Sequence, residues 1–131
     1  MGEHQTPHAY PRVHLREDGI MHVDFGLHPY LDMATVQRAL DLHRDIAPSL
    51  ARPVMVTMDG AVRTELDAEL LARGDDAGSL IAAMAVVTRS VLGTHVAQQF
   101  MWYRKPELYP VRLFGDEAEA LAWLKPYRPP A

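Results

Sequence analysis

Short runs typical of buried β-strands alternate with helical segments along most of this 131-residue chain. Segments 53–59 and 80–88 are rich in valine, methionine and alanine, as are strands that a sheet buries on both faces. A helical pattern separates each strand from the next, which predicts right-handed crossovers between parallel strands. The alternation therefore predicts a single α/β domain with the element order β-β-α-β-α-β-α-β-α.

Segment 13–26 departs from this alternation and predicts an antiparallel hairpin. A loop made of residues 17–19, with Gly19 in the left-handed conformation, leaves one face of the hairpin wholly apolar. A two-residue loop would mix polar and apolar side chains on both faces. The expected cross-strand pairs are Arg12 with Asp24, Val13 with Val23, His14 with His22, and Leu15 with Met21.

Four helices are expected from apolar spacing and from side chains that accept hydrogen bonds at helix starts. Asp32, Ser90 and Asp116 each precede such a helix, and Thr64 opens a capping-box pattern. Residues 75–79 are expected to form a polar turn. The expected helices are 33–47, 64–74, Val91–Tyr103 and 116–124, with a last strand at Val111–Phe114.

Composition restricts the classes of function. The net charge of −4 argues against general binding to nucleic acid or to anionic membranes, and the absence of cysteine excludes thiol chemistry. The longest uncharged run, 77–88, has 12 residues and is too short to span a bilayer. A cytoplasmic domain over 13–125 is expected, with a flexible arm at 1–12 and a flexible tail at 126–131.

The stretch VRLFGDEAEALAWL at 111–124 resembles the C-terminal signature of SpoIIAA-like, STAS-like bacterial proteins. In that group a strand ending in Phe is followed by an Asp-capped helix ending in Ala-x-x-Trp-Leu, here Ala120, Trp123 and Leu124. Residues 84–87 resemble the fourth strand of the group. The resemblance implies a STAS-like domain, with a mostly parallel sheet and an antiparallel N-terminal hairpin strand. This fold is shared by sulfate-transporter domains and anti-sigma-factor antagonists.

In anti-sigma-factor antagonists, a kinase partner phosphorylates a Ser or Thr at the start of the helix after the third strand. The usual Asp-Ser-x-Gly pattern is absent here, and Thr64 is the hydroxyl near that helix start. The resemblance makes Thr64 a candidate phosphorylation site, and a plain helix cap is the alternative.

Polar side chains follow two of the expected strands, where ligands gather on parallel sheets. His28 and Tyr30 follow the hairpin, and Asp59 and Thr64 follow the next strand. These four residues form a candidate site for a small polar ligand.

The seven histidines raise the question of a metal site. His14 and His22 are expected to pair on the outer face of the hairpin, with Asp24, His4 or His8 as a third ligand. Repulsion between two imidazolium rings predicts lowered basicity for one of the pair. No metal motif of fixed spacing is present, so a solvated pair without metal is expected, and no cofactor.

The helix Val91–Tyr103 ends in four large apolar or aromatic residues, which a helix spreads around its circumference. Phe100, Trp102, Tyr103 and Tyr109 are therefore a candidate partner surface, unless the neighbouring loop and tail cover them.

No catalytic motif surrounds Ser90, and His95 is expected near the buried side of its helix. We expect a non-catalytic regulatory module that binds a second copy of itself or a regulatory protein. The alternative is a sensor domain for a small ligand or a metal.

Overall fold

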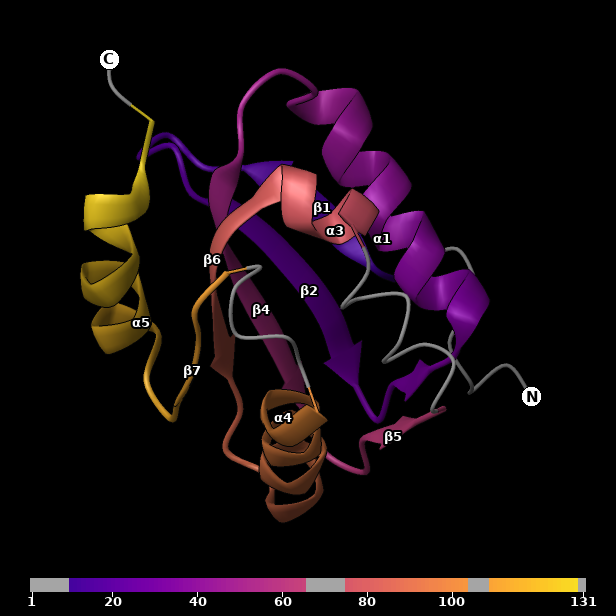
Figure 1. Ribbon diagram of the computed structural model, residues 1–131. Helices are drawn as coiled ribbons and strands as arrows, with labels where there is room; N and C mark the ends of the chain where they lie inside the picture. Colours follow the sequence, from indigo (N-terminus) through magenta and orange to yellow (C-terminus); the bar gives the residue numbers. More distant parts are fainter. Residues whose placement is uncertain (1–9, 66–74, 104–108, 130–131) are drawn as a thin grey trace.

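A five-stranded sheet forms the centre of the computed structural model, which describes residues 10–65, 75–103 and 109–129. The strand order is β1-β2-β4-β6-β7 (Figure 1). β1 is antiparallel to β2, and the other neighbouring strands are parallel, which confirms the predicted sheet. The strands are β1 (Arg12–Leu15), β2 (Met21–Leu27), β4 (Arg52–Asp59), β6 (Ile81–Val87) and β7 (Val111–Phe114).

The hairpin of β1 and β2 has the predicted register, in which Leu15 pairs with Met21 and His14 with His22. Gly19 has a φ of +86°, a left-handed conformation that side-chain-bearing residues adopt only with strain. Its N–H donates to the Arg16 carbonyl at 3.0 Å and closes the turn. The alternation of apolar residues was therefore sufficient to determine the loop length.

The helices are α1 (Met33–Ile46), α3 (Asp75–Leu80), α4 (Val91–Tyr103) and α5 (Glu117–Leu124), and a short 3-10 helix, η1 (Lys125–Tyr127), follows α5. Three predicted caps are confirmed. Asp32 accepts from the N–H of Thr35 at 2.8 Å, Ser90 from Gly93 at 2.8 Å, and Asp116 from Glu119 at 3.1 Å. Within the described ranges, no helix combines the length and apolar character needed to cross a bilayer.

The polar turn predicted for residues 75–79 is wrong, because this segment forms helix α3. Ala77 and Leu80, three positions apart and on the same side of the helix, are buried against the core. Tertiary packing on β6 and α1 outweighs the turn-forming composition of the segment. The helix predicted for 64–74 falls almost entirely outside the described residues.

The two faces of the sheet are covered unequally. Helices α1, α3 and α4 lie on one face, and α5 lies on the other (Figure 1). Ala120 and Leu124 of α5 are fully buried, and the Trp123 ring packs 5.8 Å from the Phe114 ring of β7. The C-terminal signature therefore attaches the last helix to the sheet. Beyond it, the Tyr127 ring of η1 lies 5.4 Å from the Trp123 ring.

Two strands of two residues each, β3 (Tyr30–Leu31) and β5 (Arg63–Thr64), pair in parallel to form a separate small sheet. β3 follows the end of β2, and β5 follows the end of β4. Strands this short leave no periodic pattern, so the sequence did not predict them. They place the candidate ligand residues at the carboxyl ends of the central strands.

Candidate functional site

The turn after β2 is built around His28, which has a positive φ of 55°. Its backbone N–H donates to the Asp59 carbonyl at 2.8 Å, and its Nδ1 accepts from the N–H of Ala61 at 2.8 Å. Gly60 also has a positive φ, and a Cβ at this position would collide with the His28 ring. His28 and Asp59 therefore lie side by side, as predicted, but the imidazole is held as a hydrogen-bond acceptor within the turn.

The Asp59 carboxylate joins the ends of two strands. Its Oδ1 accepts from the N–H of Arg89 at 2.7 Å and from the Thr88 hydroxyl at 3.2 Å. Both residues follow β6. This oxygen already accepts two hydrogen bonds from the chain itself, so Asp59 helps to hold the loop between β6 and α4 in place.

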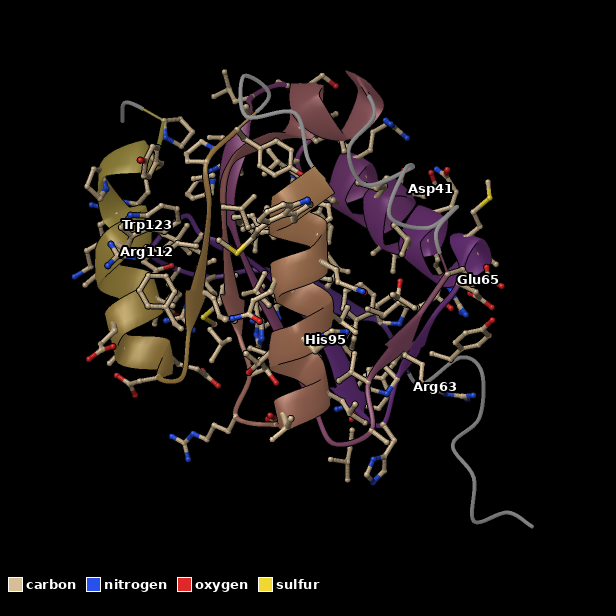
Figure 2. The ribbon with its side chains drawn as sticks, turned by 60° about the horizontal axis from the view of Figure 1, so that its bottom comes forward. Asp41, Arg63, Glu65, His95, Arg112 and Trp123 are labelled. Carbon is tan, nitrogen blue, oxygen red and sulfur yellow. The ribbon has the colours of Figure 1, made fainter. Side chains whose placement is uncertain are left out.

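Tyr30 lies on the surface and takes part in a different network. Its partners in that network are Arg63 and Glu65, which are labelled in Figure 2. The Tyr30 hydroxyl donates to Glu65 at 2.8 Å, and the Arg63 guanidinium lies 4.9 Å from the centre of the Tyr30 ring. This hydrogen bond to a carboxylate is the main reason why the pKa of Tyr30 lies above its ordinary value. The other Glu65 oxygen accepts from the N–H of Met33 at 3.4 Å, at the start of α1. The network joins β5 to the first turn of α1.

Thr64 is half-buried, and its hydroxyl donates to the Leu31 carbonyl at 3.3 Å. Thr64 also lines a cavity whose described lining includes neither Tyr30 nor Asp59. The four predicted ligand residues thus occupy three different environments. Phosphorylation of Thr64 stays a prediction.

The predicted histidine pair lies on the outer face of the hairpin, with the His14 and His22 ring centres 5.3 Å apart. His22 Nε2 is 2.9 Å from the Thr57 hydroxyl, which in turn donates to Asp24 at 3.1 Å. Because the Thr57 proton points to Asp24, Thr57 accepts from the N–H of His22. His22 therefore carries its proton on Nε2 in the neutral form.

The pKa of His22 lies below the ordinary value for histidine, mainly because the ring is partly buried. Asp24 opposes this shift, and His14 adds to it. Repulsion between the rings was the predicted cause, and it acts in the expected direction but is not the largest contribution. Among the described residues, no group of three or more His, Asp or Glu is arranged to hold a metal ion. His4 and His8 lie outside those residues.

The structure buries two of the four residues that the sequence predicted for a partner surface. Phe100 and Tyr109 are 9% and 4% exposed and belong to the main core, so neither is available to a partner. Phe100 follows Val96 by one helical turn, on the buried side of α4. Trp102 is 82% exposed. The side chain of Tyr103 lies outside the described part of the chain.

The outer face of α4 consists of exposed residues at helical spacing. Trp102 and Val91, which is 85% exposed, mark its two ends. His95, predicted near the buried side, instead lies on this exposed face (Figure 2). The prediction failed because α4 has no charged residue to mark its solvent side. The members of the outer face are Val91, Leu92, His95, Gln98, Gln99 and Trp102.

A cavity of about 120 Å³ lies between the sheet and helices α1, α3 and α4. Among its described lining residues, only His43 and Thr64 carry polar side chains. His43 is 2% exposed, and its Nε2 has no hydrogen-bond partner. The pKa of His43 is lowered to about 4, mainly by burial and also by the nearby positive charges of Arg52 and Arg44.

Sequence reasoning missed His43 as a site residue. The signal that could have found it is a histidine at the helical spacing of the buried residues of α1, beside Ala39 and Leu40. The cavity beside it depends on how well the helices fill the space above the sheet, which no sequence pattern records.

Comparisons with known proteins support the fold. A search of curated proteins finds no match. A solved structure of an uncharacterized protein of the DUF3478 family from Shewanella loihica PV-4, described as having a SpoIIAA-like fold, is similar to this chain. Its sequence is 17% identical, the match covers 86% of this chain and 90% of that one, and the TM-score is 0.55.

The likeness in structure agrees with the sheet order, the antiparallel first strand and the C-terminal helix described above. It confirms the SpoIIAA-like fold that the sequence signature predicted. A family model described as a domain of unknown function (DUF7793) matches residues 14–128. The chain therefore belongs to the DUF7793 family and has a SpoIIAA-like fold.

Proposed function

We propose that this chain is a non-catalytic module of the cytoplasm that associates with a second copy of itself through the outer face of α4. The observation that carries the proposal is the exposure of Trp102 and Val91 on a helix without a charged side chain.

An exposed helix face normally carries charged residues. The exposed side of α1 follows this rule with Arg38, Asp41, Arg44 and Asp45. The outer face of α4 instead carries apolar residues, glutamines and one histidine. Depletion of charge combined with an exposed tryptophan is typical of the centre of a protein–protein interface.

The charge pattern favours a second copy as the partner. The chain has a net charge of −4, so two copies repel each other over most approaches. The outer face of α4 avoids this repulsion because it brings no Asp, Glu, Lys or Arg to the contact. A two-fold axis would place the same face on both copies.

The spacing of the exposed residues suggests an antiparallel arrangement. Val91 and Trp102 are eleven positions apart on one side of α4, or about 16 Å along the helix. In an antiparallel pair centred between them, Trp102 of each copy contacts Val91 of the other. One helix pair buries less than the roughly 1,600 Å² of a typical stable complex, so we expect a dimer that dissociates on dilution.

Sedimentation velocity over a wide range of protein concentration tests the proposal. We expect the wild-type chain to shift from monomer to dimer as the concentration rises, and Trp102→Glu and Val91→Glu to remain monomeric. Leu50→Glu, which changes an exposed leucine before β4, is the matched control and should dimerise normally.

The double variant Val91→Lys with Trp102→Glu tests the antiparallel arrangement. It places opposite charges in contact in an antiparallel dimer and should recover part of the association that each single change removes. A wild-type chain that stays monomeric throughout contradicts self-association. A regulatory protein would then be the partner to seek for this surface.

A further inference from the structure

A polar pocket of about 410 Å³ lies at the end of the sheet where β2 and β4 begin, opposite the turn that holds His28. The hairpin turn between β1 and β2 forms one side of it, and the end of η1 forms another. Figure 1 shows these two segments side by side. Three cationic side chains belong to the described lining, namely Arg52 at the start of β4, Lys125 in η1, and Arg128 directly after η1.

Two of these cationic side chains meet at Gly19. A Cβ built on Gly19 would lie 3.7 Å from Cδ of Arg128 and 3.9 Å from Nη1 of Arg52. Arginine side chains that meet at one glycine bring like charges together, which is unfavourable unless an anion lies between them. Among the residues that the structure describes, no Asp or Glu forms an ion pair with Arg52, Lys125 or Arg128. The polar pocket therefore gathers positive charge without a carboxylate to neutralise it.

Arg128 is held in place by two backbone carbonyls. Its Nε donates to the Lys125 carbonyl at 3.1 Å, and its Nη1 donates to the Asp18 carbonyl at 3.2 Å. These contacts fix the direction of the guanidinium without cancelling its charge. They use two of its five N–H groups, so three remain for a ligand. A planar guanidinium held in one orientation matches the oxygens of a phosphoryl group.

Two carboxylates also line the polar pocket, and they restrict the kind of anion that fits. The Asp18 carboxylate accepts from Arg16 Nε at 3.2 Å and from the N–H of Ile20 at 3.2 Å, so its charge is balanced within the hairpin turn. Glu17 is exposed. These groups repel a long polyanion such as nucleic acid, whereas the hydroxyl groups of a small ligand can donate to them.

We propose that the polar pocket is a binding site for a small phosphate monoester that carries hydroxyl groups. Its phosphoryl oxygens accept from Arg52, Lys125 and Arg128, and its hydroxyl groups donate to Glu17 and Asp18. The volume of about 410 Å³ lies within the range of roughly 300–1,000 Å³ that is usual for small-molecule sites. Glycerol 3-phosphate represents this class. Inorganic phosphate is the matched anion without the organic part, and glycerol is the matched molecule without the anion.

Isothermal titration calorimetry of the full chain, at constant ionic strength set with sodium chloride, tests the site. We expect glycerol 3-phosphate to bind saturably and more tightly than inorganic phosphate, and glycerol to give no saturable heat. Arg128→Gln should weaken binding of the ester about tenfold or more, because it removes hydrogen bonds between charged groups. Arg128→Lys keeps the charge but loses the planar group, so its affinity should lie between the two. Arg89→Gln makes the same change in net charge at an exposed position after β6 and should bind as the wild type does.

A second variant removes the charge that β4 supplies. Arg52→Gln should also weaken binding of glycerol 3-phosphate about tenfold or more. Because Arg52 is half-buried, thermal unfolding checks that this variant folds. Lys125→Gln, at an exposed position, replaces it if it has no cooperative thermal transition.

Three results would overturn the proposal. The first is that glycerol 3-phosphate gives no saturable heat with the wild-type chain. The second is that inorganic phosphate binds as tightly as the ester, and the third is that Arg128→Gln and the folded second variant both keep the wild-type affinity. None of these results depends on whether the chain dimerises through α4, because the described lining of the polar pocket includes no residue of that helix.

Discussion

The Asp59 carboxylate lies 2.7 Å from the backbone nitrogen of Arg89, a contact that joins the carboxyl ends of β4 and β6. The chain then enters α4 directly, with Ser90 capping the first turn. The position of the first turn of α4 therefore depends on an aspartate thirty residues earlier in the sequence. Because α4 carries both the proposed dimer surface and part of the cavity wall, this contact affects both of them.

Asp59→Ala should lower the free energy of unfolding by about 1–2 kcal/mol, because the Arg89 N–H and the Thr88 hydroxyl lose their acceptor. Asp59→Asn keeps an oxygen at this position and should cost less. Urea denaturation measures both changes. Asp45→Ala, which removes an exposed carboxylate from α1, should stay within about 0.5 kcal/mol of the wild type, and an equal loss there would contradict the assigned role of Asp59.

Gly60→Ala should destabilise the chain by about 2 kcal/mol or more. The residue has a φ of +79°, and the added Cβ would collide with the His28 ring. Gly115→Ala is the matched control, because a Cβ there meets nothing within 4 Å. Thermal unfolding followed by circular dichroism compares the two variants. Similar midpoints for both would show that the turn after β4 tolerates a side chain.

The stability of the chain should depend on pH through His43. The unfolded chain binds a proton on this residue near pH 6.5, whereas the folded chain does so only near pH 4. The free energy of unfolding is therefore at its full value above pH 6.5. It decreases by about 3 kcal/mol as the pH falls towards 4, because the unfolded chain then binds a proton that the folded chain does not.

Denaturation curves between pH 7 and pH 4 measure this dependence, with the wild type compared with two variants. His43→Leu should remove most of the slope that His43 contributes, and His95→Gln should retain it. If wild type and His43→Leu lose the same stability on acidification, the imidazole is not held in its neutral form.

His22 should titrate below the ordinary range for histidine in an NMR pH series. His14→Ala should raise the pKa of His22 because it removes a repelling neighbour, and Asp24→Asn should lower it because it removes an attracting one. Shifts in these opposite directions distinguish electrostatic coupling from a general change in burial. If both substitutions moved the His22 pKa the same way, the pair would not be coupled as described.

The hairpin shows how much of the fold could be predicted from the sequence. One face of the pair had to be apolar, and a single register satisfies this condition, so the pairing of Leu15 with Met21 followed directly. The caps Asp32 and Asp116 were equally predictable, because a side-chain acceptor before an apolar helical stripe has a local cause.

The errors have physical causes. Residues 75–79 look like a turn locally, but Ala77 and Leu80 form a helix once other elements cover them. The buried side of α4 was assigned incorrectly because the helix has little contrast between apolar and charged positions. Tyr109 could be placed in the core only once β7 and its neighbours were assembled.

The site was less predictable than the fold. Residues following neighbouring strands do converge, as the contact between His28 and Asp59 shows. Which way each side chain then points depends on partners elsewhere in the chain, such as Glu65 for Tyr30. An empty space next to His43 results from imperfect packing and leaves no trace in the spacing of residues.

The sheet has two short edges. β1 and β7 each have four residues, half the length of β4, and each follows a proline, Pro11 or Pro110, that has no N–H to offer a neighbouring strand. A strand from another molecule would find only a brief ladder on either side, so growth of the sheet into fibrils is disfavoured. The dimer proposed through α4 would therefore form at high concentration without the risk that strands of neighbouring copies extend the sheet.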